Sequence, residues 1–517
     1  MSIALANRNP VPGEYDVAII GCGVSGANIA RRLSAYDVRT AILEKAADVS
    51  FGTSKANSGI VHGGFHHNKK HLKARLEIQG NLMFDQLRRE LDFPFKRNGI
   101  IVAALHEDEM KAVEHLYMQG VENGVIGIEL CSRERILELE PKLSPDTVGG
   151  LYAPGGGMIE PYRFVFALVE SAMKNGVHLY TDFKVCAASW DSGGRIDSSA
   201  ASGASSPVSP ASPSAVSAAG GREGLWTVRG EDGRTVKARY VVNAAGLYAD
   251  DVSRIFGGEE FTIKARKGEY FLMDRLTRAR PERVIFPVPT AVSKGMLVIP
   301  TVEGTVLVGP TADTVEDKAD YSTTAEHLEE ILESGKDMVP SLSRGDVIAS
   351  FAGLRPFLDE DFYIEPSARA PALVQVAGIQ SPGLTASPAI GLYVKDLLKG
   401  MGLNLTEKSH WDPFVEDRPR FRELNPYEQD RLIAGDPQWG NVVCRCEKVS
   451  EAEIVQAVRL GHCTLDGIKY FTRAQMGRCQ GGFCTYKIIK IIMRETGLSW
   501  AELTKHGGAS RLLEAEL

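Results

Sequence analysis

A glycine-rich turn between a short strand and a helix constrains the fold of this chain more than any other feature. Residues 15–20, Tyr-Asp-Val-Ala-Ile-Ile, are typical of a buried strand, and they lead directly into Gly21-x-Gly23-x-x-Gly26 and a helix that ends near Leu33. A second strand over residues 38–44 ends in Glu44. Strand, helix and strand in this order form a βαβ unit. The pattern therefore predicts an α/β protein with a Rossmann-like domain.

The same residues predict a dinucleotide site. The glycines allow a tight turn and a close approach of the backbone to a pyrophosphate, and the start of the helix favours its negative charge. Glu44 can accept hydrogen bonds from the ribose hydroxyl groups. Because the sequence contains no second fingerprint of this kind, a separate nicotinamide nucleotide site is not expected. These residues alone leave the choice between NAD and FAD open.

Apolar periodicity and turn residues predict domains that are interrupted in the sequence. The nucleotide-binding domain is expected over residues 1–95, 151–260 and 350–402, and an inserted antiparallel-sheet substrate domain over 96–150 and 261–349. Residues 192–222 are nearly all Ser, Ala, Gly and Pro, which predicts a disordered insertion. A polar linker over 403–440 then precedes a small helical domain over 441–517 that carries most of the cysteines.

Charge and hydropathy restrict the possible partners. The 517 residues hold 59 Lys and Arg against 66 Asp and Glu, a net charge of −7, and the chain has no basic arm, so nucleic acid is not an expected partner. No apolar run is long enough for a transmembrane helix, and the first residues do not resemble a secretory signal. A cytoplasmic location is expected, with any membrane association arising through a partner.

Four cysteines near the C-terminus form a predicted metal site. Cys444-x-Cys446 is followed by Cys479 and Cys484, which are separated by four residues. Four thiolates suit an iron–sulfur cluster or zinc, but Cys-x-Cys is a tight spacing for zinc. Nearby glycines could also present backbone N–H groups to bridging sulfides. The spacing resembles that of bacterioferritin-associated ferredoxin modules, and this resemblance implies a [2Fe–2S] cluster, with structural zinc as the alternative.

Two later glycine turns carry a second resemblance. Residues 241–246, Val-Val-Asn-Ala-Ala-Gly, and 376–387, Val-Ala-Gly-Ile-Gln-Ser-Pro-Gly-Leu-Thr-Ala-Ser, resemble segments of the glycine-oxidase and D-amino-acid-oxidase superfamily of flavoproteins. That resemblance implies FAD, with the last turn beneath the isoalloxazine ring and its helix N-terminus facing the negative charge that develops on the flavin. The predicted FAD contacts are Gly21, Gly23, Gly26, Glu44, Ser54, Asn57, Ser58, Val185, Ala245, Gly246, Gly378, Gly383, Leu384 and Thr385.

His62 is the candidate general base. It lies in residues 53–65, where small and hydroxylated residues precede a histidine that is followed by two glycines. One interpretation makes this a flavin-packing loop in which His62 only hydrogen-bonds the cofactor. In the other, His62 removes the proton of a secondary alcohol, for which an ordinary histidine pKa of about 6.5 is suitable. His66 and His67 are expected at the surface or in a channel.

Arg355 is the candidate anion-binding residue. It lies in Gly353-Leu-Arg-Pro356, and an arginine in such a segment could belong to a structural ion pair. In the superfamily that the chain resembles, the matching arginine binds the anionic group of the substrate, and a guanidinium group suits a carboxylate or a phosphate. Arg266, Lys267 and Tyr270 could line the same pocket, although a solvated turn is an equal interpretation for the first two. Tyr270 is also a candidate catalytic residue.

Taken together, the chain resembles the A-subunit type of anaerobic glycerol-3-phosphate dehydrogenases, apart from the insertion. That resemblance implies oxidation of sn-glycerol 3-phosphate to dihydroxyacetone phosphate, with electrons passing through the cluster to a redox partner subunit or a quinone-linked acceptor. Residues 56–62, Ala-Asn-Ser-Gly-Ile-Val-His, also resemble the L-2-hydroxyglutarate dehydrogenase branch. A third interpretation is an electron-relay or docking subunit without catalytic activity of its own.

Overall fold

A parallel sheet forms the centre of the first domain. A computed structural model describes residues 7–192, 224–289 and 295–513, and its first sheet has β1 (Glu14–Ile20) between β2 (Thr40–Leu43) and β12 (Thr235–Asn243). The strands β9 (His178–Tyr180) and β20 (Leu373–Ala377) continue this sheet beyond β2 and β12, and all five strands are parallel. The order changes direction at β1, where ligands of doubly wound folds bind.

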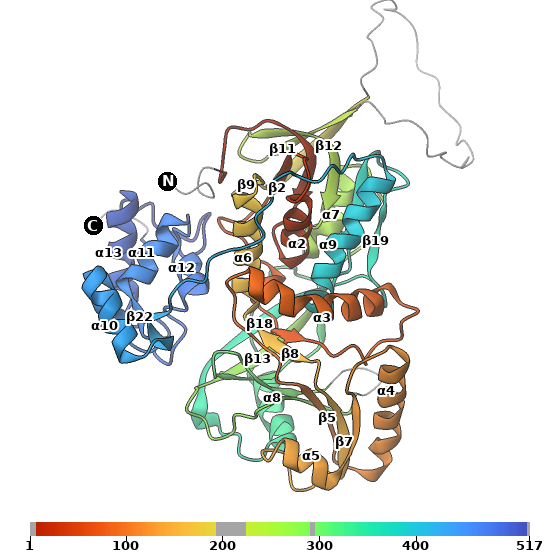
Figure 1. Ribbon diagram of the computed structural model, residues 1–517. Coiled ribbons are helices and arrows are strands. Elements are labelled where there is room, and N and C mark those ends of the chain that lie inside the picture. The colour runs from red at the N-terminus through yellow and green to blue at the C-terminus, as the bar shows by residue number, and fades with distance from the viewer. Residues whose placement is uncertain (1–6, 193–223, 290–294, 514–517) are drawn as a thin grey trace, which may run out of the picture.

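Alternating side chains of β1 enter two different apolar cores. Val17 and Ile19 contact the helices α2 (Val24–Leu33), α6 (Pro161–Lys174) and α9 (Gly383–Gly400). Ala18 and Ile20 face the other core, under α7 (Ala249–Ile255) and the hairpin of β10 (Val185–Asp191) and β11 (Leu225–Gly230). Because the side-chain period of a strand is two, both faces of the sheet are covered (Figure 1).

The second domain is built on a nine-stranded sheet. Its longest pair is β13 (Lys264–Met273) with β18 (Val347–Phe357), which run antiparallel over almost their whole lengths. The helices α4 (Met110–Glu122), α5 (Arg133–Leu139) and α8 (Ala325–Met338) pack against it (Figure 1). The remaining strands are β5 (Ile100–Ala104), β6 (Glu129–Ser132), β7 (Gly149–Ala153), β14 (Val284–Pro287), β15 (Leu297–Pro300), β16 (Val306–Gly309) and β17 (Asp313–Val315).

This sheet differs in two ways from the expectation. β5 pairs in parallel with β14, so the sheet is mixed and not wholly antiparallel. The predicted boundaries at residues 150 and 350 both fall inside strands of this sheet, since β7 pairs with β5 and β18 with β13. A strand cannot be divided between two sheets without loss of its hydrogen bonds, so β7 and β18 belong wholly to the second domain.

A three-stranded sheet of β3 (Ile60–Val61), β4 (Phe95–Lys96) and β8 (Gly157–Ile159) links the two domains, and α3 (Leu72–Glu90) packs along α9. α9 begins at Gly383, in the predicted last glycine turn, and Pro388 lies inside the helix. The predicted insertion over 192–222 lies, except for its first residue, outside the described residues.

The C-terminal domain contains α11 (Glu451–Arg459), α12 (Leu465–Thr472), α13 (Thr485–Thr496) and the short strands β21 (Val442–Cys444) and β22 (Val449–Ser450). Its apolar residues, such as Ile454 and Ile468, join the same core as β1 and α6. The segment predicted as a linker contains α10 (Pro426–Gly435) and contacts the first domain, where Arg31 lies over the Trp411 ring. Among the described helices, none is long and apolar enough to cross a bilayer.

Candidate active site and metal centre

One large cavity lies between the carboxyl ends of the parallel strands and the second domain. It has a volume of about 1370 Å³ and is lined by the glycine turn, by residues 52–62, by Arg355 and by the turn before α9. Ligand sites of drug-sized molecules occupy about 300–1,000 Å³. This cavity therefore has room for a dinucleotide together with a small substrate.

Each of the three positions in the turn requires or favours glycine for a different structural reason. Gly21 has a φ of +99°, and a Cβ atom there would lie 2.6 Å from the Ala244 carbonyl oxygen. At Gly26, a Cβ would lie 2.1 Å from the Gly21 carbonyl oxygen, so only glycine lets the helix approach the turn. A Cβ at Gly23 would meet only the Ser54 hydroxyl oxygen, at 3.2 Å, on the cavity side. This division of roles is that of a pyrophosphate-binding turn.

Glu44 is buried beside the turn. One carboxylate oxygen accepts a hydrogen bond from the Cys22 N–H at 2.7 Å, and the other accepts one from the Ala46 N–H at 2.8 Å. Burial raises the pKa of this carboxyl group, and the two backbone N–H groups oppose that rise. Each carboxylate oxygen has capacity for a further hydrogen bond, and Glu44 lines the cavity. Glu44 is therefore placed to accept ribose hydroxyl groups.

The cavity gathers most of the predicted cofactor contacts. Those that line it are Gly21, Gly23, Glu44, Ser54, Asn57, Ser58, Val185, Ala245, Gly246, Gly383 and Leu384. Ser54 also accepts a hydrogen bond from the Val24 N–H at 2.9 Å, at the start of α2. Gly26, Gly378 and Thr385 are not among the lining residues. The Thr385 hydroxyl accepts from the His62 N–H at 2.8 Å, so this side chain holds the histidine backbone instead of facing the cavity.

His62 is buried at the wall of the cavity. Its Nε2 atom lies 3.3 Å from the Ser381 hydroxyl oxygen, and its carbonyl oxygen accepts from the Asn81 amide at 2.6 Å. The ring lies edge-on to His66 and tilted to Phe286, with centroids 5.7 and 5.9 Å away. His66 and His67 also line the cavity, which agrees with the channel interpretation and not with the surface one.

Arg355 lies at the same cavity. Its guanidinium donates to the Thr311 carbonyl at 2.7 Å, and more weakly to the carbonyls of Arg266 and Lys267. Burial lowers its pKa. No carboxylate of the described residues forms an ion pair with it, so an ion pair does not explain its position. A partly buried guanidinium group held by carbonyl oxygens is suited to an anion.

Tyr270 lies beside Arg355 and stacks on Phe351 at 5.0 Å between centroids. Its hydroxyl group is hydrogen-bonded to Ser58, and burial raises its pKa. Tyr270 and Arg266 both line the cavity. Lys267 does not: it is buried in ion pairs, with Nζ 2.9 Å from an Asp320 carboxylate oxygen and 3.9 Å from Glu269. Both interpretations offered for Lys267 are therefore wrong.

The four predicted metal ligands approach one another as two pairs. The sulfur atoms of Cys446 and Cys479 are 3.5 Å apart, and Cys444 is hydrogen-bonded to Cys484. That hydrogen bond lowers the pKa of Cys444 to about 6, which favours the thiolate that binds metals. Within the described ranges, no three His, Cys, Asp or Glu side chains converge to hold a single ion. Two pairs suit a cluster of two irons with two cysteines each, whereas mononuclear zinc needs four thiolates around one point.

The loops around these thiols are suited to a cluster. A Cβ at Gly477 would lie 2.2 Å from the Cys446 Cβ, so only glycine fits between the two ligand loops. Backbone N–H groups of Gly481 and Phe483 donate to the Cys479 sulfur. Such N–H···S contacts tune the potential of iron–sulfur clusters. The residues present therefore fit a [2Fe–2S] group.

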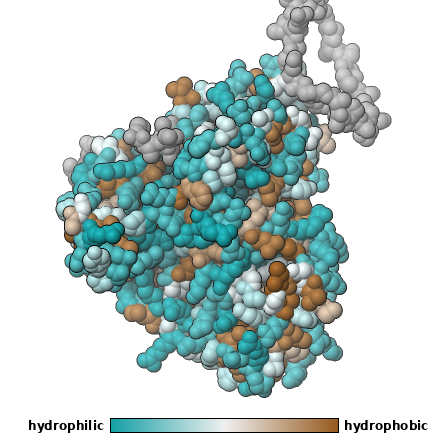
Figure 2. All heavy atoms as spheres, viewed as in Figure 1, coloured by the Kyte–Doolittle hydropathy of each residue, from teal (hydrophilic) through white to brown (hydrophobic). Residues whose placement is uncertain are grey.

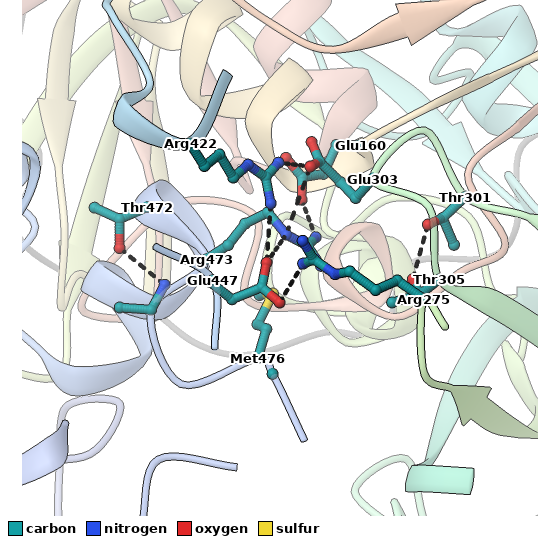
Figure 3. Close-up of polar contacts among 12 residues, drawn as sticks. Glu160, Arg275, Thr301, Glu303, Thr305, Arg422, Glu447, Thr472, Arg473 and Met476 are labelled. Atoms are coloured by element: carbon teal, nitrogen blue, oxygen red, sulfur yellow. Dashed lines mark hydrogen bonds and ion pairs between the residues drawn. The ribbon is translucent and has the colours of Figure 1, made fainter. Parts of the chain in front are cut away.

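Buried charges fix this domain against the rest of the molecule (Figure 3). Glu447, next to Cys446, pairs with Arg473 of its own domain at 3.1 Å, with Arg422 of the linker at 2.9 Å and with Arg275 of the second domain at 2.6 Å. Arg473 also pairs with Glu160 at the start of α6, and Arg422 with Glu303. All three domains therefore meet at one charge network.

Comparison with known proteins places the chain in a family. Residues 16–397 match the model of the FAD dependent oxidoreductase family. The chain belongs to that family. This FAD dependent oxidoreductase also has a second match over residues 442–494, to the BFD-like [2Fe-2S] binding domain. FAD and the [2Fe–2S] cluster expected from the sequence are thus confirmed at the level of these two families, as is the mixed α/β fold with its C-terminal domain.

Individual relatives agree with this assignment. A glycerol 3-phosphate dehydrogenase of Caloramator mitchellensis is 40% identical over 503 residues, 96% of this chain and 98% of that protein. A solved L-alpha-glycerophosphate oxidase from Mycoplasma pneumoniae with FAD bound matches with a TM-score of 0.69 and 30% identity, covering 79% of this chain and 99% of its own. A mitochondrial L-2-hydroxyglutarate dehydrogenase of Arabidopsis thaliana is 25% identical over 74% of this chain and 83% of its own.

Sequence reasoning missed some residues of the site. Ser381 is the hydrogen-bond partner of His62. Its segment is recognised from the glycines and the helix start, and no motif marks the serine itself. Lys45 and Tyr248 form a cation–π pair at 3.2 Å on the cavity wall, and no motif signals either residue. The acidic side of the charge network, Glu160 and Glu303, lies far from the cysteines in sequence. Only the folded chain brings these residues together.

Proposed function

We propose that this FAD-dependent oxidoreductase oxidises sn-glycerol 3-phosphate to dihydroxyacetone phosphate. The observation that carries the proposal is the position of Arg355 in the cavity that holds the glycine turn, Tyr270 and His62. The guanidinium group, held by carbonyl oxygens, would bind the phosphate. The names of two relatives that cover most of their own lengths support the same substrate.

The chain's own residues supply binding and proton transfer. Arg355 anchors the phosphate and thereby fixes the secondary alcohol, and His62 accepts the hydroxyl proton as the ketone forms. Ser381, 3.3 Å from Nε2, orients the imidazole ring. Bound FAD would take the hydride from the same carbon. Tyr270, buried and hydrogen-bonded to Ser58, closes the pocket beside the anion.

The electrons are proposed to leave through the cysteine domain. Two thiol pairs would hold the [2Fe–2S] cluster that receives electrons from the flavin, one at a time. A redox partner subunit or a quinone-linked acceptor would then take them. Attachment to a membrane through such a partner, from the cytoplasmic side, is part of the same proposal.

An L-2-hydroxy acid is the second candidate substrate. Arg355 would bind a carboxylate with the same geometry as a phosphate, and the L-2-hydroxyglutarate dehydrogenase relative supports this alternative.

Anaerobic bleaching of the oxidised flavin by each compound separates the candidates. We expect sn-glycerol 3-phosphate to bleach the flavin fully and L-2-hydroxyglutarate to leave it oxidised. Bleaching by L-2-hydroxyglutarate alone would reverse the assignment. No bleaching by either compound, with dithionite still effective, would support a relay subunit without dehydrogenase activity.

A further inference from the structure

One of the two thiol pairs lies near the molecular surface. Cys444 and Cys484 are buried, whereas Cys446 and Cys479 are partly exposed. A cluster held by these pairs would therefore have one inner and one outer iron. The outer iron is the one that an external electron carrier could approach.

Two exposed aromatic residues flank the ligand Cys484 in the sequence, and the backbone N–H of the first, Phe483, donates to the sulfur of the outer Cys479. Phe483, directly before Cys484, is 82% exposed, and Tyr486, two residues after it, is 57% exposed. Tyr486 is held in place because it stacks on Trp500 and lies under the Lys490 ammonium group at 4.5 Å. Exposed aromatic residues of this kind are enriched among the residues that dominate binding at interfaces.

The segments that carry the ligand cysteines also carry four exposed basic residues. Arg445 lies between two ligand cysteines, Lys448 follows Cys446 by two residues, and Lys487 and Lys490 lie on α13; all four are exposed. None of them forms an ion pair with a described carboxylate. The nearby carboxylates are already neutralised: Glu447 by three arginines and Glu451 by Arg494. The surface around the cluster is thus positive in a chain whose net charge is −7.

We propose that this surface, formed by Arg445, Lys448, Phe483, Tyr486, Lys487 and Lys490, is the docking site of an acidic electron-carrier protein. The proposal rests on the proposed role of the cluster as the electron exit. The basic residues steer an acidic partner toward the outer iron, and the aromatic residues supply the desolvated centre of the contact. One electron passes from the reduced cluster to the carrier, and no proton is transferred.

The basic residues have one rival role, which is to offset the negative charge of the cluster itself. The two roles predict different measurements. Charge compensation would change the midpoint potential of the cluster and affect all acceptors alike. Docking would change the rate with an acidic acceptor in particular, and that effect would weaken with salt, because exposed charges are screened.

Plastocyanin, an acidic one-electron copper protein, is the probe. The full-length protein, loaded with flavin and cluster, is reduced with dithionite, so that the result does not depend on the substrate. Reduction of the copper is followed by stopped flow over a range of ionic strength. Binding of redox-inactive, zinc-substituted plastocyanin is measured separately by calorimetry. We expect the wild-type rate constant to fall with salt, and a basic acceptor, cytochrome c, to react slowly with the opposite salt dependence.

The variant K487E/K490E tests the surface charge away from the ligand loops. We expect its rate constant with plastocyanin to fall by about tenfold to a thousandfold at low salt, the usual range of electrostatic steering, with iron content and cluster potential unchanged. The matched control K111E/K399E changes the net charge equally on α4 and α9, on the other side of the molecule (Figure 1), and should react like the wild type. Phe483→Ser should weaken binding of the zinc-substituted probe at all salt concentrations.

Three results would overturn the proposal. The first is an equal rate constant for K487E/K490E and its control. The second is a change in cluster potential that accounts for the whole loss of rate, which would assign the lysines to charge compensation. The third is an undiminished rate with Cys479→Ser, which lacks a cluster ligand, since the electrons would then leave from the flavin directly.

Discussion

Arg355 is the proposed anion-binding residue, because carbonyl oxygens hold its guanidinium group at the cavity. We predict that Arg355→Leu raises KM and lowers kcat/KM for sn-glycerol 3-phosphate while FAD stays bound. Removal of one partner from a desolvated charge pair costs about 2–5 kcal/mol, or about thirtyfold to several thousandfold. Arg355→Lys should recover part of the loss. If the steady-state kinetics of Arg355→Leu match those of the wild type, Arg355 has only a structural role.

His62 is the proposed general base, so its loss should slow one step of the reaction, the reduction of the flavin. We predict that His62→Ala slows flavin reduction in single-turnover experiments by about a hundredfold to ten-thousandfold, the usual contribution of a general base. Ser381→Ala should have a smaller effect, because Ser381 only orients the ring. This test requires that the His62→Ala variant retains bound FAD. A rate that falls only in proportion to lost FAD would make His62 a cofactor-packing residue.

At the scale of single elements, the turn between β1 and α2 depends on its first glycine. We predict that Gly21→Ala reduces the FAD bound per chain to a small fraction, because the new Cβ would lie 2.6 Å from the Ala244 carbonyl at a φ of +99°. Crowding of this kind costs about 1–3 kcal/mol or more. The control is Gly435→Ala, where nothing lies within 4 Å. Full FAD content in both variants, measured by absorbance, would contradict this role.

The elements that the sequence predicts well are those with a local signal. The glycine turn, the buried strands and the two cysteine motifs, Cys444-x-Cys446 and Cys479 with Cys484, each occupy one short segment, so their spacing is visible without the fold. The direction of β14 against β5 and the true limits of β7 and β18 depend on partners distant in sequence. The side on which Thr385 lies depends on the residue directly after β3, because the His62 N–H donates to the Thr385 hydroxyl group. These features therefore could not be read from spacing.

At the scale of the whole molecule, the charge network holds the C-terminal domain in place. Burial raises the pKa of Glu160, but the Arg473 charge, the Tyr162 hydroxyl group and the Arg420 charge together outweigh burial and lower that pKa. We predict that Glu160→Gln destabilises the protein by about 3–5 kcal/mol, because Arg473 loses a buried partner. The surface control Glu329→Gln, which removes an exposed ion pair with Arg344, should cost about 0–1 kcal/mol. Thermal unfolding at neutral pH measures both.

The Glu160–Arg473 ion pair also makes the stability of the protein depend on pH. Since the folded pKa of Glu160 is lowered, its stabilisation is fully present above the ordinary carboxyl range and is lost as pH falls through the lowered pKa. The difference in stability between wild type and Glu160→Gln should therefore shrink in acid. A difference that stays constant down to the acid limit of folding would show that the variant acts through packing.

For the whole molecule, we propose that electrons move from an alcohol anchored at Arg355 to the flavin and then to the iron–sulfur cluster. An anaerobic titration with sn-glycerol 3-phosphate, followed by visible absorption and by electron paramagnetic resonance, measures both transfers in one sample. We predict that the flavin bleaches and that the signal of a one-electron-reduced [2Fe–2S] cluster then appears. A flavin that stays oxidised at saturating substrate, or a bleached flavin beside a cluster that only dithionite reduces, would contradict this sequence of transfers.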